Sequence, residues 1–517
     1  MSCVPMPCTD TKAPTGVVPG FVAVNSRWVL AATVLGSSMD YIDGTVVNVA
    51  LPSMQNLLGA TGTQAQWVVE SYALFLAALL LTGGSLGDRF GFRRIFLFGV
   101  VLFAVASLGC GLAHGISQLL FARSLQGVGG ALLVPNSLAL LSSEFEGADR
   151  ARAIGTWSGF GAIMTALGPV VGGWVVQHAS WRWAFLLNVP VAIATVWITL
   201  TKVPNREHDP GMFPLDVQGA LLVTAGLGCV VYGMLEWSNG HLLSRVAGTA
   251  GLVFLAMFVI TERNAKSPLI PPELFLNRTF SGANLLTFFL YGALSATFFY
   301  LPLNLIQAQG YTPTQAGAAL LPMVLLMFFL SRWAAGLVQK WGARLPLWMG
   351  PLIAAVGYVL FARPRVGGCY WLNYFPAITI LGLGMTISVA PLTTVVMSSV
   401  DDNRSGIASG INNAVSQMAA LLALALSAPL FFAKFSAELK TNLASSHVPA
   451  QVVTQVEGQR RQLGAIRVTD ARAKTAVDEA FADSFRLIVL LAAGSAAVAG
   501  FTAMVTIRDE RLTRVRS

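Results

Sequence analysis

Long apolar stretches recur along almost the whole chain and are separated by short polar segments. Most of them reach about 20 residues, the length that an α-helix needs to cross about 30 Å of hydrocarbon. About fourteen such stretches are present, and we expect each to form one membrane-spanning helix. The predicted helices lie near residues 27–50, 65–86, 95–114, 117–141, 151–177, 183–201, 215–236, 243–261, 280–307, 313–335, 345–362, 371–397, 406–433 and 485–506. The pattern therefore predicts a polytopic all-α membrane protein.

The composition supports a membrane protein. Of the 517 residues, 55% are hydrophobic and only 11% are charged, whereas soluble domains carry about 25% charged residues. A soluble protein of this size could not cover its surface with so few charges. The net charge of +9 could indicate a nucleic-acid partner, but the basic residues are dispersed between apolar stretches. They are better explained as residues that fix the orientation in the membrane, so we expect no nucleic-acid partner.

The distribution of Lys and Arg predicts the orientation. An even number of spans places both termini on one side of the membrane. If that side is cytoplasmic, the inner loops and tails hold about 19 Lys and Arg and the short outer loops hold about four, as the positive-inside rule requires. The outer four are Arg182, Arg245, Arg363 and Arg365. We predict an integral protein of the cytoplasmic membrane with both termini inside the cell.

The chain contains an internal repeat. A Leu-Pro dipeptide at 51–52, after the first predicted helix, matches one at 301–302 after the ninth. The segment 88–93, after the second helix, matches 339–344 after the tenth. Both matches are offset by about 250 residues, which indicates two similar halves. Two halves packed around a central cavity suit alternating access, in which one half rocks against the other.

The repeat and the orientation together divide the chain into five parts. The one long hydrophilic segment falls on the outer side, and its stretches 449–463 and 469–485 look helical. A small helical hairpin over the outer mouth and a simple tether are both open at this point. The parts are a disordered cytoplasmic tail (1–26), an N-terminal six-helix half (27–202), two inserted helices (203–265), a C-terminal six-helix half (266–507) with the outer loop 434–484, and a cytoplasmic tail (508–517).

Residues that could build an enzyme or metal site are scattered. The five cysteines and five histidines are far apart in the sequence, and no nucleotide-binding loop or nucleophile–base pair is present. This spacing indicates neither a disulfide framework nor a metal site. We therefore expect a protein that is not an enzyme and that binds no metal.

The segment 83–94 joins the second and third predicted helices on the cytoplasmic side. Glycine permits a tight turn there, and Asp88 can accept hydrogen bonds from a helix N-terminus or pair with an arginine. The functional interpretation is a latch that holds one conformation closed, and the alternative is a plain basic loop. The repeat has Gln339 in place of Asp88, so a latch there would lack its acid. The latch residues are Gly84, Asp88, Arg89, Gly91 and Arg93.

The fifth predicted helix contains a cluster of small residues around one proline. Glycine lets helices approach closely, and Pro169 removes a backbone hydrogen bond and allows a kink. A gating role and plain helix packing both remain open. The cluster comprises Gly168, Pro169, Gly172 and Gly173.

Segment 83–94, the Gly-Pro cluster and three further segments together resemble the fourteen-helix drug:proton antiporter branch of the major facilitator superfamily. Segment 83–94 is similar to the signature loop of the superfamily, and the Gly-Pro cluster is similar to the antiporter signature of the branch. The resemblance implies two six-helix halves plus two inserted helices, and it implies export. Further matching strings lie at 43–52, 123–130 and 181–190.

Four ionisable residues lie at a similar depth within predicted helices. A charge at the centre of the bilayer costs at least about 2.5–3.5 kcal/mol and is rarely kept without a partner or a function. At about 1.5 Å per residue, all four fall in one layer just outside the midplane. The four residues are Asp40, Asp43, Glu70 and Arg123.

We hypothesise that the three acids form one proton-coupling set with Arg123 as counter-charge. Carboxylates beside an arginine can bind and release a proton as their access to water changes. The alternative is that Arg123 and one aspartate form a permanent structural ion pair. The family resemblance implies a coupling role for Asp43, whereas Asp40 and Glu70 are not part of that minimal motif.

Eight aromatic residues are candidates to line a substrate cavity. For any single one of them, however, a lipid-facing or interfacial position is favoured. The candidates are Trp67, Tyr72, Phe288, Phe289, Tyr291, Phe298, Phe299 and Tyr300.

The sequence thus favours a proton-coupled antiporter that exports small amphipathic or hydrophobic, drug-like compounds as a monomer. Its partners would be the substrate, protons and the lipid bilayer, with the proton gradient in place of a cofactor. A facilitator or a proton-coupled importer on the same fold is the alternative, and the Gly-Pro cluster argues against it.

Overall fold

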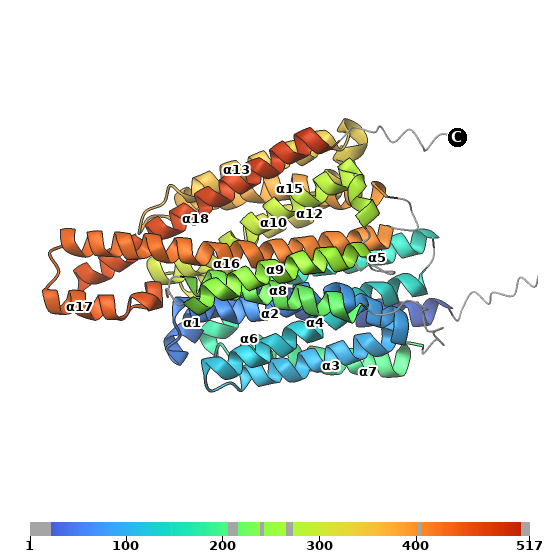
Figure 1. The fold of residues 1–517 in the computed structure, drawn as a ribbon, viewed down its shortest axis with the longest axis horizontal. Helices are drawn as coiled ribbons and strands as arrows, with labels where there is room; N and C mark the ends of the chain where they lie inside the picture. Colours follow the sequence, from blue (N-terminus) through green and yellow to red (C-terminus); the bar gives the residue numbers. More distant parts are fainter. Residues whose placement is uncertain are drawn as a thin grey trace, which may run out of the picture.

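A computed structural model describes most of the chain. The described residues are 22–145, 147–204, 216–237, 242–264, 272–400 and 405–507. Their regular secondary structure is entirely helical, and most of the helices run along one common axis (Figure 1). The predicted tail 508–517 lies outside the described residues, as does most of the predicted tail 1–26.

Thirteen helical segments are long and apolar enough to cross a membrane. Helix α1 (Val22–Leu58) is not among them, because the acids Asp40 and Asp43 and neighbouring Ser and Gly residues lower its hydropathy. It nevertheless runs beside the other long helices (Figure 1). Together with α1, these segments match the predicted spans, so the predicted fold class is confirmed.

The first six spans pack mainly against one another. Helices α2 and α3 both pack on α4, and α1 packs on α5 and α7. Helix α1 begins at Val22 instead of residue 27, and it continues past Pro52 to Leu58. The remaining helices of this half are α2 (Gly62–Phe90), α3 (Phe92–Gly111), α4 (Ile116–Glu144), α5 (Gly147–His178), the short α6 (Trp183–Leu186) and α7 (Asn188–Lys202).

The last six spans form a second group. In this group α10 and α13 both pack on α18, and α15 packs on α12 and α13. Its elements are η2 (Pro272–Leu276), α10 (Arg278–Leu303), the π-helical η3 (Asn304–Ala308), α11 (Pro313–Ala319), α12 (Leu321–Trp341), α13 (Arg344–Phe361), α14 (Tyr370–Asn373), α15 (Phe375–Ser398), α16 (Ser405–Ser445), α17 (Ala450–Gly458), η5 (Arg460–Ala465) and α18 (Ala471–Thr506).

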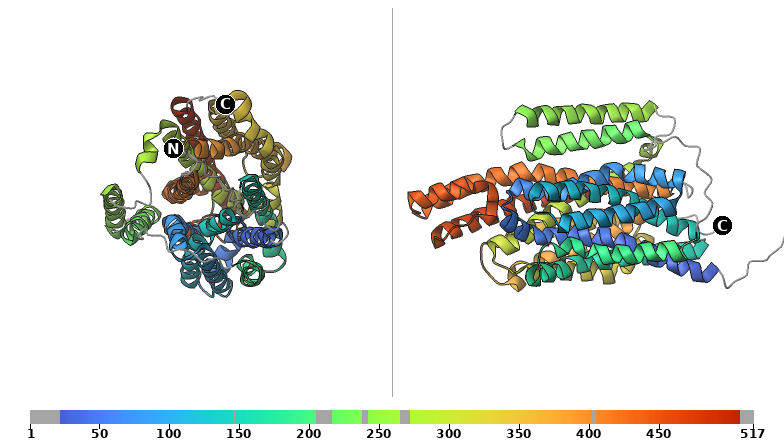
Figure 2. Two further views of the ribbon diagram at one scale, coloured as in Figure 1. Left: turned by 90° about the vertical axis from the view of Figure 1, so that its right-hand side faces the viewer. Right: turned by 90° about the horizontal axis from the view of Figure 1, so that it is seen from below.

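The two inserted helices form a pair on the outside of the bundle. Helix α8 (Val217–Leu235) packs on α9 (Leu242–Asn264), and α8 also contacts α2 and α16. Figure 2 shows the pair set apart from the other helices. Any site between the two halves is therefore built without α9.

The repeat is visible in the backbone of two tight turns. Gly91 connects α2 to α3 with a φ of 92°, and Gly342 follows α12 with a φ of 80°. Each donates its N–H to the carbonyl four residues earlier, at 2.9 Å and 3.1 Å respectively. Such positive φ angles favour glycine because it has no Cβ. The predicted loop 83–94 is thus mostly helix, and Gly91 alone makes the turn.

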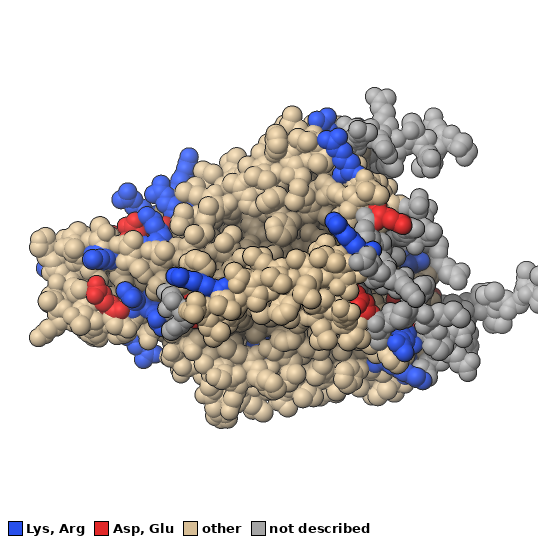
Figure 3. Space-filling view, viewed as in Figure 1, with Lys and Arg blue, Asp and Glu red and all other residues tan. Residues whose placement is uncertain are grey.

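The ends of the bundle carry most of the charge. On the face shown in Figure 3, Lys, Arg, Asp and Glu gather toward the two ends and leave an uncharged belt between them, as expected for a membrane-spanning surface. Helix α1 begins and α18 ends at the same end (Figure 1). We call the opposite end, where α17 lies, the outer end, following the predicted orientation, which itself stays a prediction.

The hydrophilic segment at the outer end is a packed helical hairpin. Helix α16 extends to Ser445, α17 and η5 follow, and α18 begins at Ala471. The η5 turn contacts α1 and α2 of the first half as well as α16 and α18 of the second. The prediction of helical stretches is confirmed, and the simple tether is wrong.

Candidate functional site

A buried ion pair joins α1 to α4 in the first half. Arg123 is 1% exposed and Asp43 is 0% exposed, and Nη1 of Arg123 donates to Oδ2 of Asp43 at 2.5 Å. Nε of Arg123 also donates to the backbone carbonyl of Val68 in α2 at 2.9 Å. The guanidinium therefore holds three helices together.

Neutral side chains complete the surroundings of Asp43. The Gln126 amide donates to Oδ1 of Asp43 at 2.8 Å, and its carbonyl accepts from Arg123 at 2.8 Å. The same amide donates to the Ser107 hydroxyl in α3 at 2.9 Å. Asn188 in α7 donates to Asp43 at 3.5 Å and to Ser107 at 3.4 Å. Each carboxyl oxygen of Asp43 thus accepts at least one hydrogen bond.

Gln126, Ser107 and Asn188 are not predicted from the sequence. Gln126 follows Arg123 by three residues and so shares its helix face, which is a usable signal. Asn188 lies in the matching string 181–190. Ser107 gives no signal, because a serine in an apolar helix commonly bonds the backbone of its own helix.

Asp40 joins this network through Tyr72. The Tyr72 hydroxyl of α2 donates to Oδ1 of Asp40. The guanidinium carbon of Arg123 lies 4.3 Å from the centroid of the Tyr72 ring, a cation–π contact. Asp40 is half-buried, and within the described part of the chain no ion pair links it directly to Arg123. Asp40 thus bonds Tyr72 and Asp43 bonds Arg123, the two members of one cation–π contact.

Glu70 lies apart from these groups. Its side chain is completely buried in α2, and neither carboxyl oxygen has a hydrogen-bond partner in the structure. Val68 and Tyr72 contact Arg123, and Glu70 is two residues from each, so it points to the opposite face of α2. The predicted convergence of three acids on Arg123 therefore holds for Asp40 and Asp43 but not for Glu70. The role of each acid in proton coupling stays a prediction.

Glycines bring α2 and α4 close enough for these contacts. A Cβ at Gly127 would collide with the carbonyl oxygen of Tyr72, and one at Gly83 would collide with that of Ala131. Small residues permit such backbone approach between membrane helices. The short separation lets Arg123 reach the Val68 carbonyl.

The predicted latch lies at the inner end of α2 and α3. Asp88 and Arg89 are exposed in the last turn of α2. Arg93, in the first turn of α3, donates through Nη2 to the carbonyls of Thr199 at 3.0 Å and Leu200 at 3.3 Å. This contact places a cation at the C-terminal end of α7, where the helix dipole favours it. Gly84 faces Pro135 of α4, with 3.7 Å between a Cβ built there and the proline Cβ. The latch function itself stays a prediction.

Two glycines of the Gly-Pro cluster press α5 against α1. A Cβ at Gly168 would collide with the Thr45 hydroxyl, and one at Gly172 would lie 2.7 Å from Cγ1 of Val46. Thr45 and Val46 lie two and three residues after Asp43 along α1. The cluster therefore packs against the helix that carries the buried ion pair.

The other members of the cluster contact the second half. A Cβ at Gly173 would collide with the backbone carbonyl of Pro313 in α11, and one at Gly317 would collide with that of Pro169. Two backbones from different halves thus touch directly. Plain helix packing accounts for this contact, and a gating role would act through the same surface.

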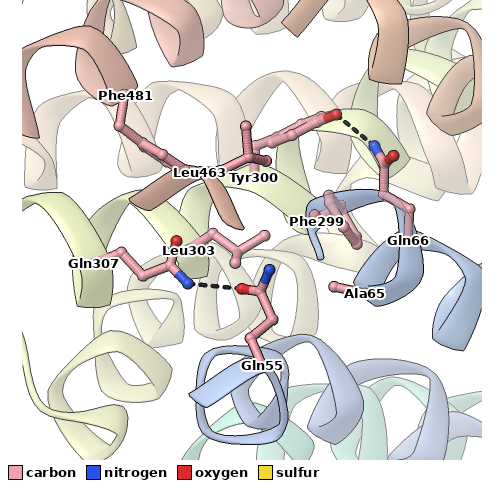
Figure 4. Close-up of a pocket in the computed structure, with 10 residues that line it drawn as sticks. Gln55, Ala65, Gln66, Phe299, Tyr300, Leu303, Gln307, Leu463 and Phe481 are labelled. Atoms are coloured by element: carbon pink, nitrogen blue, oxygen red, sulfur yellow. Dashed lines mark hydrogen bonds between the residues drawn. The ribbon is translucent and has the colours of Figure 1, made fainter. Parts of the chain in front are cut away.

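Glutamine side chains add polar contacts between the halves near the outer end. The Gln307 amide of η3 donates to the Gln55 carbonyl of α1 at 2.7 Å. The Gln66 amide of α2 donates to the Tyr300 hydroxyl of α10 at 2.6 Å. Figure 4 shows both bonds at the edge of a small pocket that Leu463 of η5 also lines. We call these two bonds the outer gate contacts.

The outer hairpin covers the same region. Leu463 has a φ of 56°, unusual for a leucine, and a Cβ at Gly62 would lie 2.9 Å from its Cγ. Arg467 donates to the Asn56 carbonyl at 2.7 Å, and Lys474 donates to the Gln307 carbonyl at 3.2 Å. The hairpin thus bonds both halves.

The predicted aromatic candidates divide by burial. Tyr72, Phe299 and Tyr300 are buried, so a lipid-facing position is wrong for these three. Tyr300 stacks on Phe431 of α16 with 4.4 Å between ring centroids. The other five candidates are half-buried.

Comparison with known proteins identifies relatives of this chain. A family model described as Major Facilitator Superfamily matches residues 33–424. A multidrug resistance protein, Stp, of Mycobacterium tuberculosis is 33% identical over 393 residues, which cover 74% of this chain and 71% of Stp. The methylenomycin A resistance protein of Bacillus subtilis is 33% identical over 390 residues, covering 74% and 82%. The tetracenomycin C resistance and export protein of Streptomyces glaucescens is 32% identical over 389 residues, covering 74% and 71%.

Solved structures share the fold at low sequence identity. A bacterial homologue of the human lysosomal transporter Spinster, in an inward-facing and unoccupied conformation, aligns with a TM-score of 0.65 and 18% identity. The alignment covers 92% of this chain and 97% of that one. At this identity the likeness supports the fold alone.

Proposed function

Because the chain belongs to the major facilitator superfamily, we propose that it exports small amphipathic or hydrophobic, drug-like compounds across the cytoplasmic membrane in exchange for protons. Transport proceeds by alternating access between the two halves. Relatives named for multidrug resistance, antibiotic resistance and export support this substrate class.

The observation that carries the proposal is the buried Asp43–Arg123 pair. A charged pair this deep in a transmembrane half is expensive, and such pairs commonly mark ion or proton pathways. In soluble proteins, removing one partner of a buried pair costs about 3–5 kcal/mol, because the other charge is left uncompensated. A proton on Asp43 would likewise leave the charge of Arg123 uncompensated. Arg123 must then bond another negatively charged acceptor.

Asp40 is the carboxylate that could serve as this acceptor, because it shares Tyr72 with Arg123. It is half-buried, it is bound to Tyr72, and the Tyr72 ring stacks on the guanidinium. We infer that protonation of Asp43 moves Arg123 toward Asp40, and that deprotonation returns it. The move changes the contact of α4 with α1, which packs on the Gly-Pro cluster of α5. The proton thus acts on the surface where α5 meets the second half.

Energised inverted membrane vesicles test the direction and the energy source. On acidification of the vesicle interior, an exporter should accumulate the fluorescent cation ethidium inside, and a protonophore should abolish the accumulation. Facilitated diffusion would give equilibration without accumulation, and a proton-coupled importer would give no uptake. A growth-inhibition panel with and without expression would then define the substrate range.

A permanent structural ion pair is the competing account of Asp43 and Arg123. It requires only that the two charges be present together or absent together. The two accounts differ in the behaviour of a doubly neutral variant, which is described with the predictions below.

A further inference from the structure

Glu70 lies one helical turn below an outer gate contact. Gln66 precedes it by four residues and therefore shares its face of α2, about 6 Å nearer the outer end. The Gln66 amide bonds the Tyr300 hydroxyl of α10, and Tyr300 stacks on Phe431 of α16. Glu70 therefore faces the junction between the halves, and it is placed just beneath a bond that must break when the outer end opens.

The surroundings of Glu70 provide no countercharge. Its side chain is 0% exposed, and among the residues that the structure describes neither carboxyl oxygen has a hydrogen-bond partner. The adjoining α2–α16 interface is apolar and includes Leu74, Leu421 and Ala425. Helix α16 has no charged residue between positions 405 and 433, and α10 has none after Arg278.

The nearest titratable groups on the packed helices have other partners. From α4, Arg123 is bonded to Asp43 and to the Val68 carbonyl. From α1, Asp40 accepts from Tyr72. The α10 neighbour is the Tyr300 phenol, bonded to Gln66, and the α8 neighbour is the Tyr232 phenol, against Trp67. None of these groups is placed to neutralise Glu70.

An ionised carboxylate in such a site is strongly disfavoured. The closed outer end therefore accommodates Glu70 as the neutral acid. When the halves part at the outer end, breaking the Gln66–Tyr300 bond would admit water to the same face of α2, and hydration would stabilise the carboxylate. Closure and proton binding at Glu70 are then linked.

We propose that Glu70 is a second proton-binding site, separate from the Asp43–Arg123 pair, whose protonation permits the outer end to close. One proton from outer water adds to the carboxylate before closure; no other covalent bond is made or broken, and the Gln66–Tyr300 hydrogen bond forms as the end closes. For a closed state that binds one additional proton, the ratio of closed to open molecules rises by up to about tenfold per unit fall in pH. This assignment deepens the proposed proton coupling but does not require that the protein export any compound.

The test measures closure without substrate. Spin labels are placed on the native Cys369, which is exposed in the second half, and on a Leu57→Cys substitution at the exposed end of α1. The other four cysteines are removed. Pulsed electron spin resonance in nanodiscs between pH 5 and 8 then reports the closed and open populations. The wild type should shift toward the short distance on acidification.

Glu70→Gln is the main variant, because glutamine is the uncharged isostere of the protonated acid and should fold in the same site. It should favour the closed population at all pH values. It should also remove the contribution of Glu70 to the pH dependence, which is a change of up to about tenfold in the closed-to-open ratio per pH unit. Glu70→Asp should keep a pH-dependent shift and guards against a general loss of structure. Glu438→Gln, at a partly exposed carboxylate paired with Lys434, is the matched control and should follow the wild type.

Two results separate this proposal from the exporter proposal. If Glu70→Gln and the wild type give superimposable curves, while Asp43→Asn abolishes the pH dependence, Glu70 is not the proton-binding group and the inference is overturned. If the Glu70-dependent shift is present but vesicles accumulate no compound, the inference stands and the export function fails.

Discussion

The two six-helix halves differ in the kind of polar group that they bury. In the described part of the first half, the fully buried side chains include three ionisable ones, Asp43, Glu70 and Arg123. In the described part of the second half, the corresponding buried polar side chains are neutral Asn, Thr and Ser residues. The backbone repeat is preserved in the glycine turns at Gly91 and Gly342, so the halves share architecture while their chemistry has diverged.

Some neutral side chains of the second half form hydrogen bonds with one another across helices. Asn412 of α16 donates to Asn284 at 3.1 Å and to Thr287 at 2.7 Å, both in α10. Asn304 donates to the Tyr374 hydroxyl at 3.1 Å. Amides do not titrate near neutral pH, so these contacts hold helices together in the same way at any physiological pH. This difference leads us to expect any proton dependence in the first half, whose buried side chains can titrate, and not in the second.

The largest expected effect comes from neutralising Asp43. Asp43→Asn should abolish proton-coupled export while membrane expression is retained, because the site loses its titratable group. The double variant Asp43→Asn with Arg123→Gln then distinguishes the two accounts of the pair. If the pair is only structural, removing both charges should restore export; if it couples protons, export should remain absent. Dye accumulation in inverted vesicles, normalised to protein level, measures both.

Substitution of Arg123 should act mainly on pH dependence. Arg123→Ala removes the cation that favours the ionised aspartates, so substrate-linked proton release should require a higher pH. Arg123→Lys keeps the charge but loses the forked geometry that bonds Asp43, Val68 and Gln126 together, so we expect less change in pH midpoint but impaired transport. Substrate binding measured as a function of pH for both variants checks this. If the binding curves of both variants coincide with that of the wild type, Arg123 is not coupled to the proton-binding site.

The latch prediction concerns the balance of conformations. Asp88→Ala should reduce transport about five- to tenfold, which corresponds to a shift of roughly 1 kcal/mol between conformations. Substrate affinity should change little, because Asp88 lies at the inner end, far along α2 from Glu70 and Tyr72. Transport rates in vesicles and dye binding in detergent measure the two quantities. A large loss of binding with normal switching would contradict the latch.

The smallest effect is expected in the second half. Asn412→Ala removes two partly buried hydrogen bonds and should lower stability by about 1–3 kcal/mol. Export should fall by less than about threefold, and its pH profile should not move, because no charge is altered. A thermal unfolding assay and a pH series of dye export check both statements. A displaced pH profile would show that the second half takes part in proton coupling.

The fold class and a similar predicted depth for four ionisable residues follow from local patterns in the sequence. Hydrophobic length decides which segments cross the membrane, and the rarity of buried charge singles out Asp40, Asp43, Glu70 and Arg123. These are local properties that can be counted along the chain. The repeat was likewise readable, because it preserves residues at fixed offsets.

Only the tertiary structure decided which of these groups meet. Depth follows from residue number at about 1.5 Å per residue, but the direction in which a side chain points depends on how each helix is rotated against its neighbours. That rotation turns Tyr72 toward Arg123 and Glu70 away from it. It also brings Gln126 to Asp43, and it presses Gly173 of α5 against α11 of the other half. Such contacts join residues far apart in the sequence. Spacing along one helix, such as that of Gln126 from Arg123, reveals a shared face but not the partner on another helix.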